Sequence, residues 1–342
     1  MTPARWARVA LAGALLAAVW LSLDRADALD RLRSVRGGWI VAAVAALTVQ
    51  TVLAAWRWRL TAAQFGLRLG VRQSIAEYYL SQIVNQMLPG GVLGDVGRAL
   101  RSAGPAGLAR AGQAVVIERV IGNLALLGVM LGAVAAALAV PGMAPLPGRF
   151  LALAGGGALV VLAVGGVIWT LDPPVPPAPG APPALPARVG AGLRRNAATA
   201  RRAVAAGLLN RHVLPRQIAL NVAAVGANIA AFDCAARATG TQLPLAAALV
   251  LTPLILFVMM IPVTVAGWGL REGAAAALFP LAGFGSEAGL AASVAFGVSF
   301  LVSSLPGVPV MLVDAARQSA RPVTIKAAIP AVAIPPPDRP VR

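Results

Sequence analysis

The stretch SQIVNQMLPGGVLGDVGRALRSAG, residues 81–104, places polar side chains and helix breakers together between long apolar parts of the chain. The polar groups are Gln82, Asn85, Gln86, Asp95 and Arg98, and the helix breakers are Pro89, Gly90, Gly91 and Gly94. Backbone groups released from a helix cannot face lipid, because each unsatisfied group costs several kcal/mol in hydrocarbon. The stretch therefore predicts a broken, re-entrant element that lines a polar cavity.

The composition around this stretch is that of an all-α, polytopic membrane protein. Of 342 residues, 58% are apolar and only 12% are charged, whereas about a quarter of the residues of a soluble protein are charged. The apolar residues form runs of about 20, the length that crosses a bilayer as a helix. The net charge of +17 is typical of cytoplasmic loops that face anionic lipid, and we do not interpret it as nucleic-acid binding.

The apolar runs predict a single transmembrane domain over residues 1–320, followed by a proline-rich, disordered tail at 321–342. Six full spans are expected at about 9–23, 38–56, 113–140, 150–171, 214–236 and 289–313, with broken hairpins at 73–101 and 245–284. Eight full spans is the competing count. The arginines at positions 57 and 59, and those of the proline- and arginine-rich linker 172–212, are assigned to the cytoplasm. This orientation predicts an inner-membrane protein with both termini cytoplasmic.

The broken hairpins share a sequence pattern. LPGGVLGDVGRA (88–99) and IPVTVAGWGLRE (261–272) both read apolar-Pro-x4-Gly-x3-Arg. Because three full spans separate the two hairpins, they are expected to enter the membrane from opposite sides, as in the inverted repeats of many transporters. The repeat halves are expected at about 1–140 and 150–313, with hinges at Pro89, Pro262, Gly267 and Gly269.

The first hairpin has the features of an anion site. Glycines 90, 91 and 94 leave amide groups at the start of a short helix, where the helix dipole favours negative charge. Arg98, one turn later, offers a fork of donors for a phosphate, and Asp95 is expected to cap the helix or to orient Arg98. Arg271 and Glu272 repeat the arrangement. We expect Arg98 and Arg271 to wall a hydrated chamber between the hairpins.

Two further ionisable residues, Glu118 and Arg119 of IERVIG, lie about two turns into an apolar helix. Ionisable groups at membrane depth cost at least a few kcal/mol unless they are paired or wet, so they are functional candidates. The alternatives are an ion pair that fixes helix register and side chains that reach the membrane interface.

Other polar residues recur at helical spacing. Glu77, Ser81 and Asn85 form a stripe on one face of the first hairpin arm, and Asn85 is included among the candidate ligands. Asp233 and Arg237, at i,i+4, are expected to form an interfacial ion pair. Tyr78 and the tyrosine that follows it are interpreted as an interfacial aromatic belt.

The sequence predicts no metal site, cofactor or catalytic residue. One cysteine and one histidine cannot supply the ligands of a zinc site, and no acidic cluster is present to hold Mg²⁺. The expected partner is a membrane phospholipid or a lipid-linked headgroup, with a homodimer or a partner membrane enzyme as further possibilities.

The segments NQMLPGGVLGDVGRA, VIERVIGNLALLGV and IPVTVAGWGLREGAAAALF together resemble the lysylphosphatidylglycerol synthetase transmembrane-domain family, also described as flippase-like proteins. The resemblance runs from about residue 50 to residue 313 and implies an inner-membrane helical protein of six to eight spans with re-entrant elements. In bifunctional members of the family, the same module is implicated in moving aminoacylated phosphatidylglycerol between leaflets. By matched position, it carries over Asp95, Arg98, Glu118, Arg119, Arg271 and Glu272. About 29 residues follow Val313, so the tRNA-dependent synthase activity is expected to be missing. Trp268 stands where smaller residues are expected, so the resemblance does not specify the headgroup.

Three functions compete at this level. The first is a flippase-like translocase for anionic or aminoacylated phospholipid or lipid-linked headgroups, which the broken backbone and the paired arginines favour. The second is a membrane enzyme acting on polyprenyl-phosphate-linked sugars, with Asp95 or Glu118 as general base. The third is an accessory factor that docks a partner enzyme through the basic segment 188–202.

Overall fold

The regular elements of the chain are helices throughout the part that the computed structural model describes. That part comprises residues 10, 13–18, 20–21, 25–88, 92–139, 147–148, 151–152, 154–159, 213–259 and 264–319. The α-helices are α2 (Arg25–Arg33), α3 (Gly37–Gln64), α4 (Val71–Met87), α5 (Leu93–Ser102), α6 (Leu108–Ala139), α9 (Leu214–Ala238), α10 (Leu245–Val258), α11 (Leu270–Leu278), α12 (Ser286–Ser304) and α13 (Gly307–Ser319). Two 3-10 turns, η1 (Gly104–Ala106) and η2 (Phe279–Ala282), are also present, and the described residues 13–18, 20–21 and 154–159 are helical as well.

Four of the described helices are long and apolar enough to cross a membrane: α3, α6, α9 and α12. The shorter helices α10 and α13 are also apolar. The prediction of an all-α polytopic membrane protein is therefore confirmed. The predicted span 9–23 is described only in part, at residues 10, 13–18 and 20–21, all of which are helical. The predicted span 150–171 lies mostly outside the described residues, and the linker 172–212 and the tail 321–342 lie entirely outside them.

Two helix boundaries differ from the prediction. Helix α3 continues to Gln64, past the expected end at residue 56, so Arg57 and Arg59 belong to the helix and not to a cytoplasmic loop. The predicted single span 289–313 is wrong, because α12 ends at Ser304 and α13 begins at Gly307. Pro306 lies between them, and proline both lacks an amide hydrogen and clashes with the preceding helical turn.

Each predicted hairpin is a pair of helices with a break between them. Helix α4 ends at Met87 and α5 begins at Leu93, and Pro89, Gly90 and Gly91 lie outside the described residues. Helices α10 and α11 are separated in the same way, with Pro262 outside the described residues. Three of the four residues before α11 have a positive φ angle: Ala266 (51°), Gly267 (77°) and Gly269 (85°).

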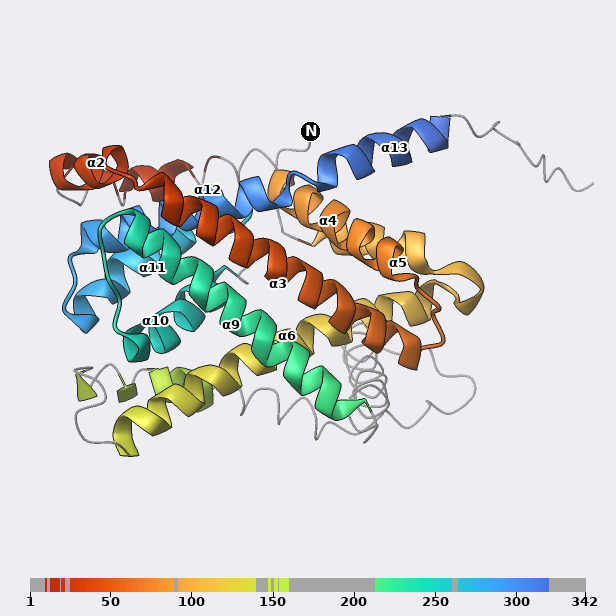
Figure 1. Cartoon of the computed structure of the whole chain (residues 1–342), viewed down its shortest axis with the longest axis horizontal. Helices are drawn as coiled ribbons and strands as arrows, with labels where there is room; N and C mark the ends of the chain where they lie inside the picture. The colour runs from red at the N-terminus through yellow and green to blue at the C-terminus, as the bar shows by residue number, and fades with distance from the viewer. Residues whose placement is uncertain are drawn as a thin grey trace, which may run out of the picture.

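The two described halves have the same order of elements, a long helix, a broken pair and another long helix. The first half is α3, α4–α5 and α6, and the second is α9, α10–α11 and α12. Helices α3 and α9 run antiparallel along each other (Figure 1). The amide of Arg36, before α3, donates to the carbonyl of Ala238 at the end of α9 at 3.0 Å. At the opposite ends, Gln217 Nε2 donates to Thr61 Oγ1 at 2.9 Å.

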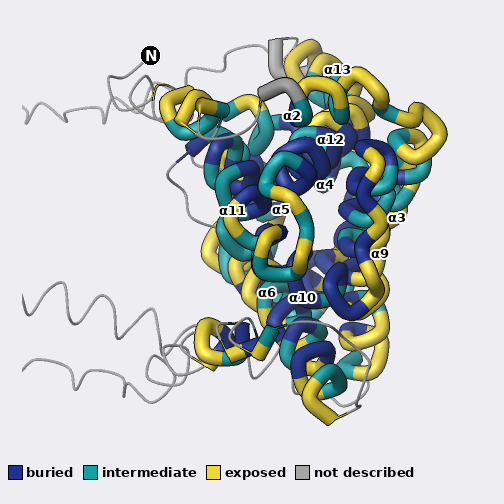
Figure 2. The backbone as a smooth tube through the Cα atoms, turned by 90° about the vertical axis from the view of Figure 1, so that its left-hand side faces the viewer, coloured by how far each residue is buried: buried dark blue, intermediate teal, exposed yellow. Residues whose placement is uncertain are grey.

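Apolar side chains are buried where the helices face one another, and Figure 2 shows the exposed positions on the outer sides of the helices. One buried cluster joins α3, α6, α9, α10, α11 and α12, and contains Leu47, Leu127, Phe232, Leu251 and Phe296. A second cluster packs α3, α5 and α6 together, and contains Trp58, Ala62, Ala99, Ala111 and Val115. The many alanines let these helices approach closely, as is common in membrane bundles.

Helix α5 has the reverse of the usual amphipathic arrangement. Asp95 and Arg98 point inward and are 8% and 1% exposed. Leu93, Val96 and Leu100 share the outer face of the helix and are 39–56% exposed. Gly94 lets α5 lie against α4, because a Cβ atom at this position would overlap the carbonyl group of Ser81. A short helix with polar groups inside and apolar groups outside suits a lipid environment.

Candidate functional site

A cavity of about 340 Å³ lies between the two broken helix pairs. Its wall includes residues of α3, α4, α5, α6 and α9, together with Thr264, Ala266 and Gly267 from the segment before α11. Such a volume is at the lower end of the range for small-molecule sites, and it is large enough for a lipid headgroup and not for a whole phospholipid. The charged residues on its wall are Arg57, Asp95, Glu118 and Arg119.

Glu118, on α6, is the centre of the buried charges. It is 0% exposed. Arg57 of α3 donates to Glu118 Oε1 through Nε at 3.0 Å, and also through Nη2. Arg98 Nη2 lies 3.2 Å from Glu118 Oε2, and the Tyr78 hydroxyl donates to Oε1 at 3.3 Å. A fully buried carboxylate is tolerated only with such partners, so Glu118 holds α3, α5 and α6 together.

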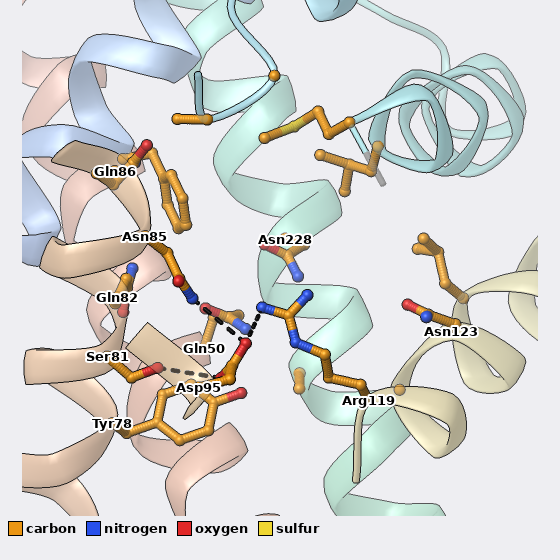
Figure 3. A pocket seen from close by; sticks show the side chains of 18 of the residues that line it. Gln50, Tyr78, Ser81, Gln82, Asn85, Gln86, Asp95, Arg119, Asn123 and Asn228 are labelled. Atoms are coloured by element: carbon orange, nitrogen blue, oxygen red, sulfur yellow. Dashed lines mark hydrogen bonds and ion pairs between the residues drawn. The ribbon is translucent and has the colours of Figure 1, made fainter. Parts of the chain in front are cut away.

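Asp95 is the second carboxylate and joins α5 to α4 and α6. Its Oδ1 accepts from Arg98 Nη2 at 2.9 Å and from Ser81 Oγ at 3.0 Å. Its Oδ2 accepts from Asn85 Nδ2 at 3.4 Å and is ion-paired with Arg119 Nη2. Figure 3 shows the Arg119 side chain extending from α6 across the cavity toward Asp95. The polar stripe predicted on α4 therefore faces α5.

Arg98 is fixed from several sides. Its guanidinium carbon lies 4.6 Å from the ring centroids of both Trp58 and Tyr78. It is ion-paired with Asp95 and Glu118. A planar guanidinium is suited to this combination of stacking and pairing. The prediction that Asp95 orients Arg98 agrees with this geometry.

Arg271 has a similar environment in the other half of the chain. Its Nη2 lies 2.6 Å from Glu272 Oε1, and its Nε lies 3.1 Å from Ser293 Oγ. Its guanidinium carbon lies 4.8 Å from the Trp268 ring and 5.7 Å from the Phe296 ring. Glu272 Oε2 also accepts from the Gly269 amide at 2.7 Å, so it caps α11.

The expectation that Arg98 and Arg271 wall the cavity is wrong. Each residue is only 1% exposed, and neither lines the cavity. Both guanidinium groups are held in the protein by carboxylates and aromatic rings, so neither is placed to meet a headgroup. The Gly94 amide is not presented to a ligand either, because it donates to Asn85 Oδ1 at 2.8 Å.

The remaining predicted residues divide into three groups. Asn85, Asp95, Glu118, Arg119 and Gly267 line the cavity. Glu272 is 0% exposed and is engaged by Arg271. Pro89, Gly90, Gly91 and Pro262 lie outside the described residues. Glu118 and Arg119 are both in ion pairs, as the alternative interpretation expects. The carboxylate pairs with Arg57 and Arg98, and the guanidinium pairs with Asp95.

We name the group Arg57, Asp95, Arg98, Glu118 and Arg119 the charge cluster. Its three guanidinium groups and two carboxylates leave one positive charge in excess. The Arg119 side chain is 46% exposed, whereas the other four side chains are at most 11% exposed. The excess positive charge is therefore presented to the cavity by Arg119. Among the described residues, no group of three histidine, cysteine or acidic side chains is placed to hold a metal ion.

The chain was compared with models of known protein families, and one family model matches the region that contains these helices. A model of the lysylphosphatidylglycerol synthase transmembrane region matches residues 5–307. The chain belongs to this family. Searches of curated proteins and of solved structures found no match. The lysylphosphatidylglycerol synthase match covers both broken helix pairs and the whole charge cluster, so the site described above lies within the family's own module.

Two features of this family member were missed by the sequence analysis. Arg57 was assigned to a cytoplasmic loop, but it is buried and also donates to Asn221 Oδ1 at 2.9 Å. Its partners are distant in sequence, and no local pattern indicates them. Six carboxamide side chains line the cavity: Gln50, Gln82, Asn85, Gln86, Asn123 and Asn228. The sequence analysis expected Gln82, Asn85 and Gln86 at a polar cavity and missed Gln50, Asn123 and Asn228. A signal for the three that were missed is visible in retrospect, since each is a polar residue in a helix that is long and apolar enough to cross a membrane.

Proposed function

We propose that this protein moves an anionic phospholipid or a lipid-linked phosphate across the membrane, with the headgroup passing through the cavity. The observation that carries the proposal is the position of Arg119. It lies twelfth in the 32-residue helix α6, about 16 Å along the helix at 1.5 Å per residue. A half-exposed guanidinium at this depth, on the wall of a polar cavity, is an anion ligand.

Arg119 is the member of the charge cluster that can exchange its partner at least cost. If Arg119 leaves Asp95 for a phosphate, Asp95 keeps Arg98, Ser81 and Asn85. By contrast, removal of Arg57 from Glu118 would leave buried charge uncompensated. The excess positive charge of the cluster equals the single negative charge of a phosphodiester. Binding of one headgroup would therefore neutralise the site.

The packing of α5 supports a membrane-embedded route. Its outer face carries Leu93, Val96 and Leu100, and Val116 and Val120 are exposed on the neighbouring helix α6. In our proposal these side chains contact acyl chains while the headgroup occupies the cavity. The two broken pairs then act as re-entrant elements of an inverted repeat, a proposal that the antiparallel packing of α3 and α9 supports.

Reconstitution into liposomes tests the proposal. The vesicles contain phosphatidylglycerol with a fluorophore on its acyl chain, and external dithionite bleaches only the label that reaches the outer leaflet. The wild-type protein should make the inner-leaflet label accessible. The Arg119→Gln variant should slow this by roughly tenfold or more, since a hydrogen bond to a charged group contributes about 1.5–3 kcal/mol.

Arg237→Gln is the matched control. Arg237 is also paired with an aspartate at i−4, at 2.7 Å, and is partly exposed, but it does not line the cavity. The control should keep the wild-type rate. Failure of the wild-type protein to move the label, or equal rates for Arg119→Gln and wild type, would overturn the proposal.

A further inference from the structure

The polar, uncharged residues of the cavity wall all carry side chains that both donate and accept hydrogen bonds. The six carboxamides come from four helices, α3, α4, α6 and α9, and Figure 3 shows them on several sides of the cavity. A carboxamide has two donor hydrogens and an acceptor oxygen. A hydroxyl group also donates and accepts, so a wall of carboxamides matches a ligand rich in hydroxyl groups.

Two residues of this wall each carry a buried polar atom that has no hydrogen-bond partner within the described chain. Gln82 is 9% exposed; its Oε1 accepts from Thr51 Oγ1 at 3.0 Å, but its Nε2 is unpaired. Thr264 is 2% exposed, and its Oγ1 is unpaired. The first belongs to α4 and the second to the segment before α11, so they lie on opposite broken pairs. Buried polar groups are nearly always paired, and a ligand in the cavity would pair both.

A cationic amine finds no comparable place. Asp95 already accepts from two guanidinium groups and two neutral donors, and Glu118 accepts from two guanidinium groups and a tyrosine. The rings of Tyr78 and Phe296 each stack on a buried arginine, at 4.6 Å and 5.7 Å. An ammonium group in the cavity would also meet the excess positive charge of the charge cluster. Carboxylates and aromatic faces are the usual ligands of amines. Here both carboxylates are occupied, and the third aromatic ring of the wall, that of Phe300, is stacked on Phe296 with the ring centroids 6.2 Å apart.

We infer that the cavity selects a phosphodiester headgroup whose other polar groups are hydroxyls, such as phosphoglycerol or a sugar phosphate, and rejects headgroups that carry an amine. Arg119 takes the phosphate, and Gln82 and Thr264 bind hydroxyl groups. This inference rests on the proposed function and specifies the class of lipid for the same site. The inference also covers aminoacylated phosphatidylglycerol: the cavity should disfavour this lipid because its headgroup carries amines.

The test compares three acyl-labelled lipids in the liposome assay: phosphatidylglycerol, phosphatidylethanolamine and lysylphosphatidylglycerol. Phosphatidylglycerol should move at least about tenfold faster than either amine-bearing lipid, because sites built to bind hydroxyls discriminate strongly against ligands that leave them unpaired. Equal rates, or faster movement of either amine-bearing lipid, would overturn the inference.

A binding measurement separates this inference from the proposed function. The detergent-solubilised full chain is heated with glycerophosphoglycerol or with glycerophosphoethanolamine. The first compound should raise the unfolding temperature, and the second should raise it less. If no lipid moves in liposomes but this preference is found, translocation is refuted and the headgroup class is retained. If both compounds act equally or neither acts, the headgroup class is refuted.

Near-isosteric variants locate the preference. Gln82→Met and Thr264→Val remove the unpaired polar atoms, and each should lower the ratio of phosphatidylglycerol to phosphatidylethanolamine transport severalfold without slowing phosphatidylethanolamine. Thr252→Val is the matched control, because Thr252 Oγ1 is also buried and unpaired but lies on α10 away from the cavity wall. The control should leave the ratio unchanged. An unchanged ratio in both test variants would contradict the assignment of these residues.

Discussion

Replacement of Glu118 by glutamine is expected to destabilise the fold strongly. The carboxylate is 0% exposed and pairs with Arg57 and Arg98. Glutamine keeps the approximate shape, but it removes the negative charge and turns an amide donor toward one of the guanidinium groups. The charge cluster then holds two excess positive charges in place of one. Because loss of one partner from a buried ion pair costs about 3–5 kcal/mol, we expect a decrease of this size in the free energy of unfolding.

The assay is titration of the detergent-solubilised protein with sodium dodecyl sulfate, followed by tryptophan fluorescence. Asp233→Asn is the matched control: it also removes a carboxylate from an arginine pair, but the side chains of Asp233 and Arg237 are 22% and 33% exposed. Pairs of this kind contribute about 1 kcal/mol or less. A loss of less than about 1 kcal/mol for Glu118→Gln, equal to that of the control, would refute the reasoning.

A second substitution tests whether stranded charge is the cause. Arg57→Met, added to Glu118→Gln, removes the cation that has lost its main partner and leaves a side chain of similar length. The double variant should be no less stable than Glu118→Gln alone, although Arg57→Met by itself should be strongly destabilising. Such non-additivity is expected of residues in direct contact. Additive losses would show that Glu118 acts through something other than its pairing with Arg57.

Further predictions concern the backbone and the stacked arginine. Gly94→Ala should lower the free energy of unfolding by about 1–3 kcal/mol, because the added methyl group overpacks against Ser81. Gly112→Ala is the control: this position of helix α6 has open space around it, so the change should be neutral or stabilising by up to about 1 kcal/mol. The same detergent titration checks both variants. Ala266→Gly should stabilise the protein by about 1 kcal/mol, since φ is 51° at this position; a loss of stability would contradict the strain. Arg98→Lys should lower the unfolding temperature although charge is kept, because an ammonium group replaces neither the stacking nor the double pairing.

Local sequence patterns were sufficient for the membrane class, the helix breaks and part of the site. The apolar runs predicted the long helices, because a helix that crosses a bilayer needs a minimum number of consecutive apolar residues. The polar stripe on α4 and the Asp233–Arg237 pair were found because residues three or four apart share a helix face. Glu118 and Arg119 stood out because ionisable groups are rare at membrane depth.

The pairing of the buried charges depended on tertiary structure. Arg57 and Glu118 are 61 residues apart, and nothing near either residue indicates the other. The sequence also placed Arg98 and Arg271 on a cavity wall, since arginine beside a helix break is a reasonable anion ligand. Packing turned both inward instead, where aromatic rings and carboxylates surround them.

By itself, then, the sequence determined that this chain is a helical membrane protein with two interrupted helices and a set of intramembrane charges. Only the tertiary structure decided which charge remains available to a ligand. The physical reason is that the free-energy cost of burying a side chain depends on that residue's own hydropathy, which can be read along the chain. Whether a buried charge has an oppositely charged partner depends on which helix faces meet in the folded protein. Arg98 is enclosed by α3, α4, α5 and α6, and Arg119 is left half-exposed on the cavity wall.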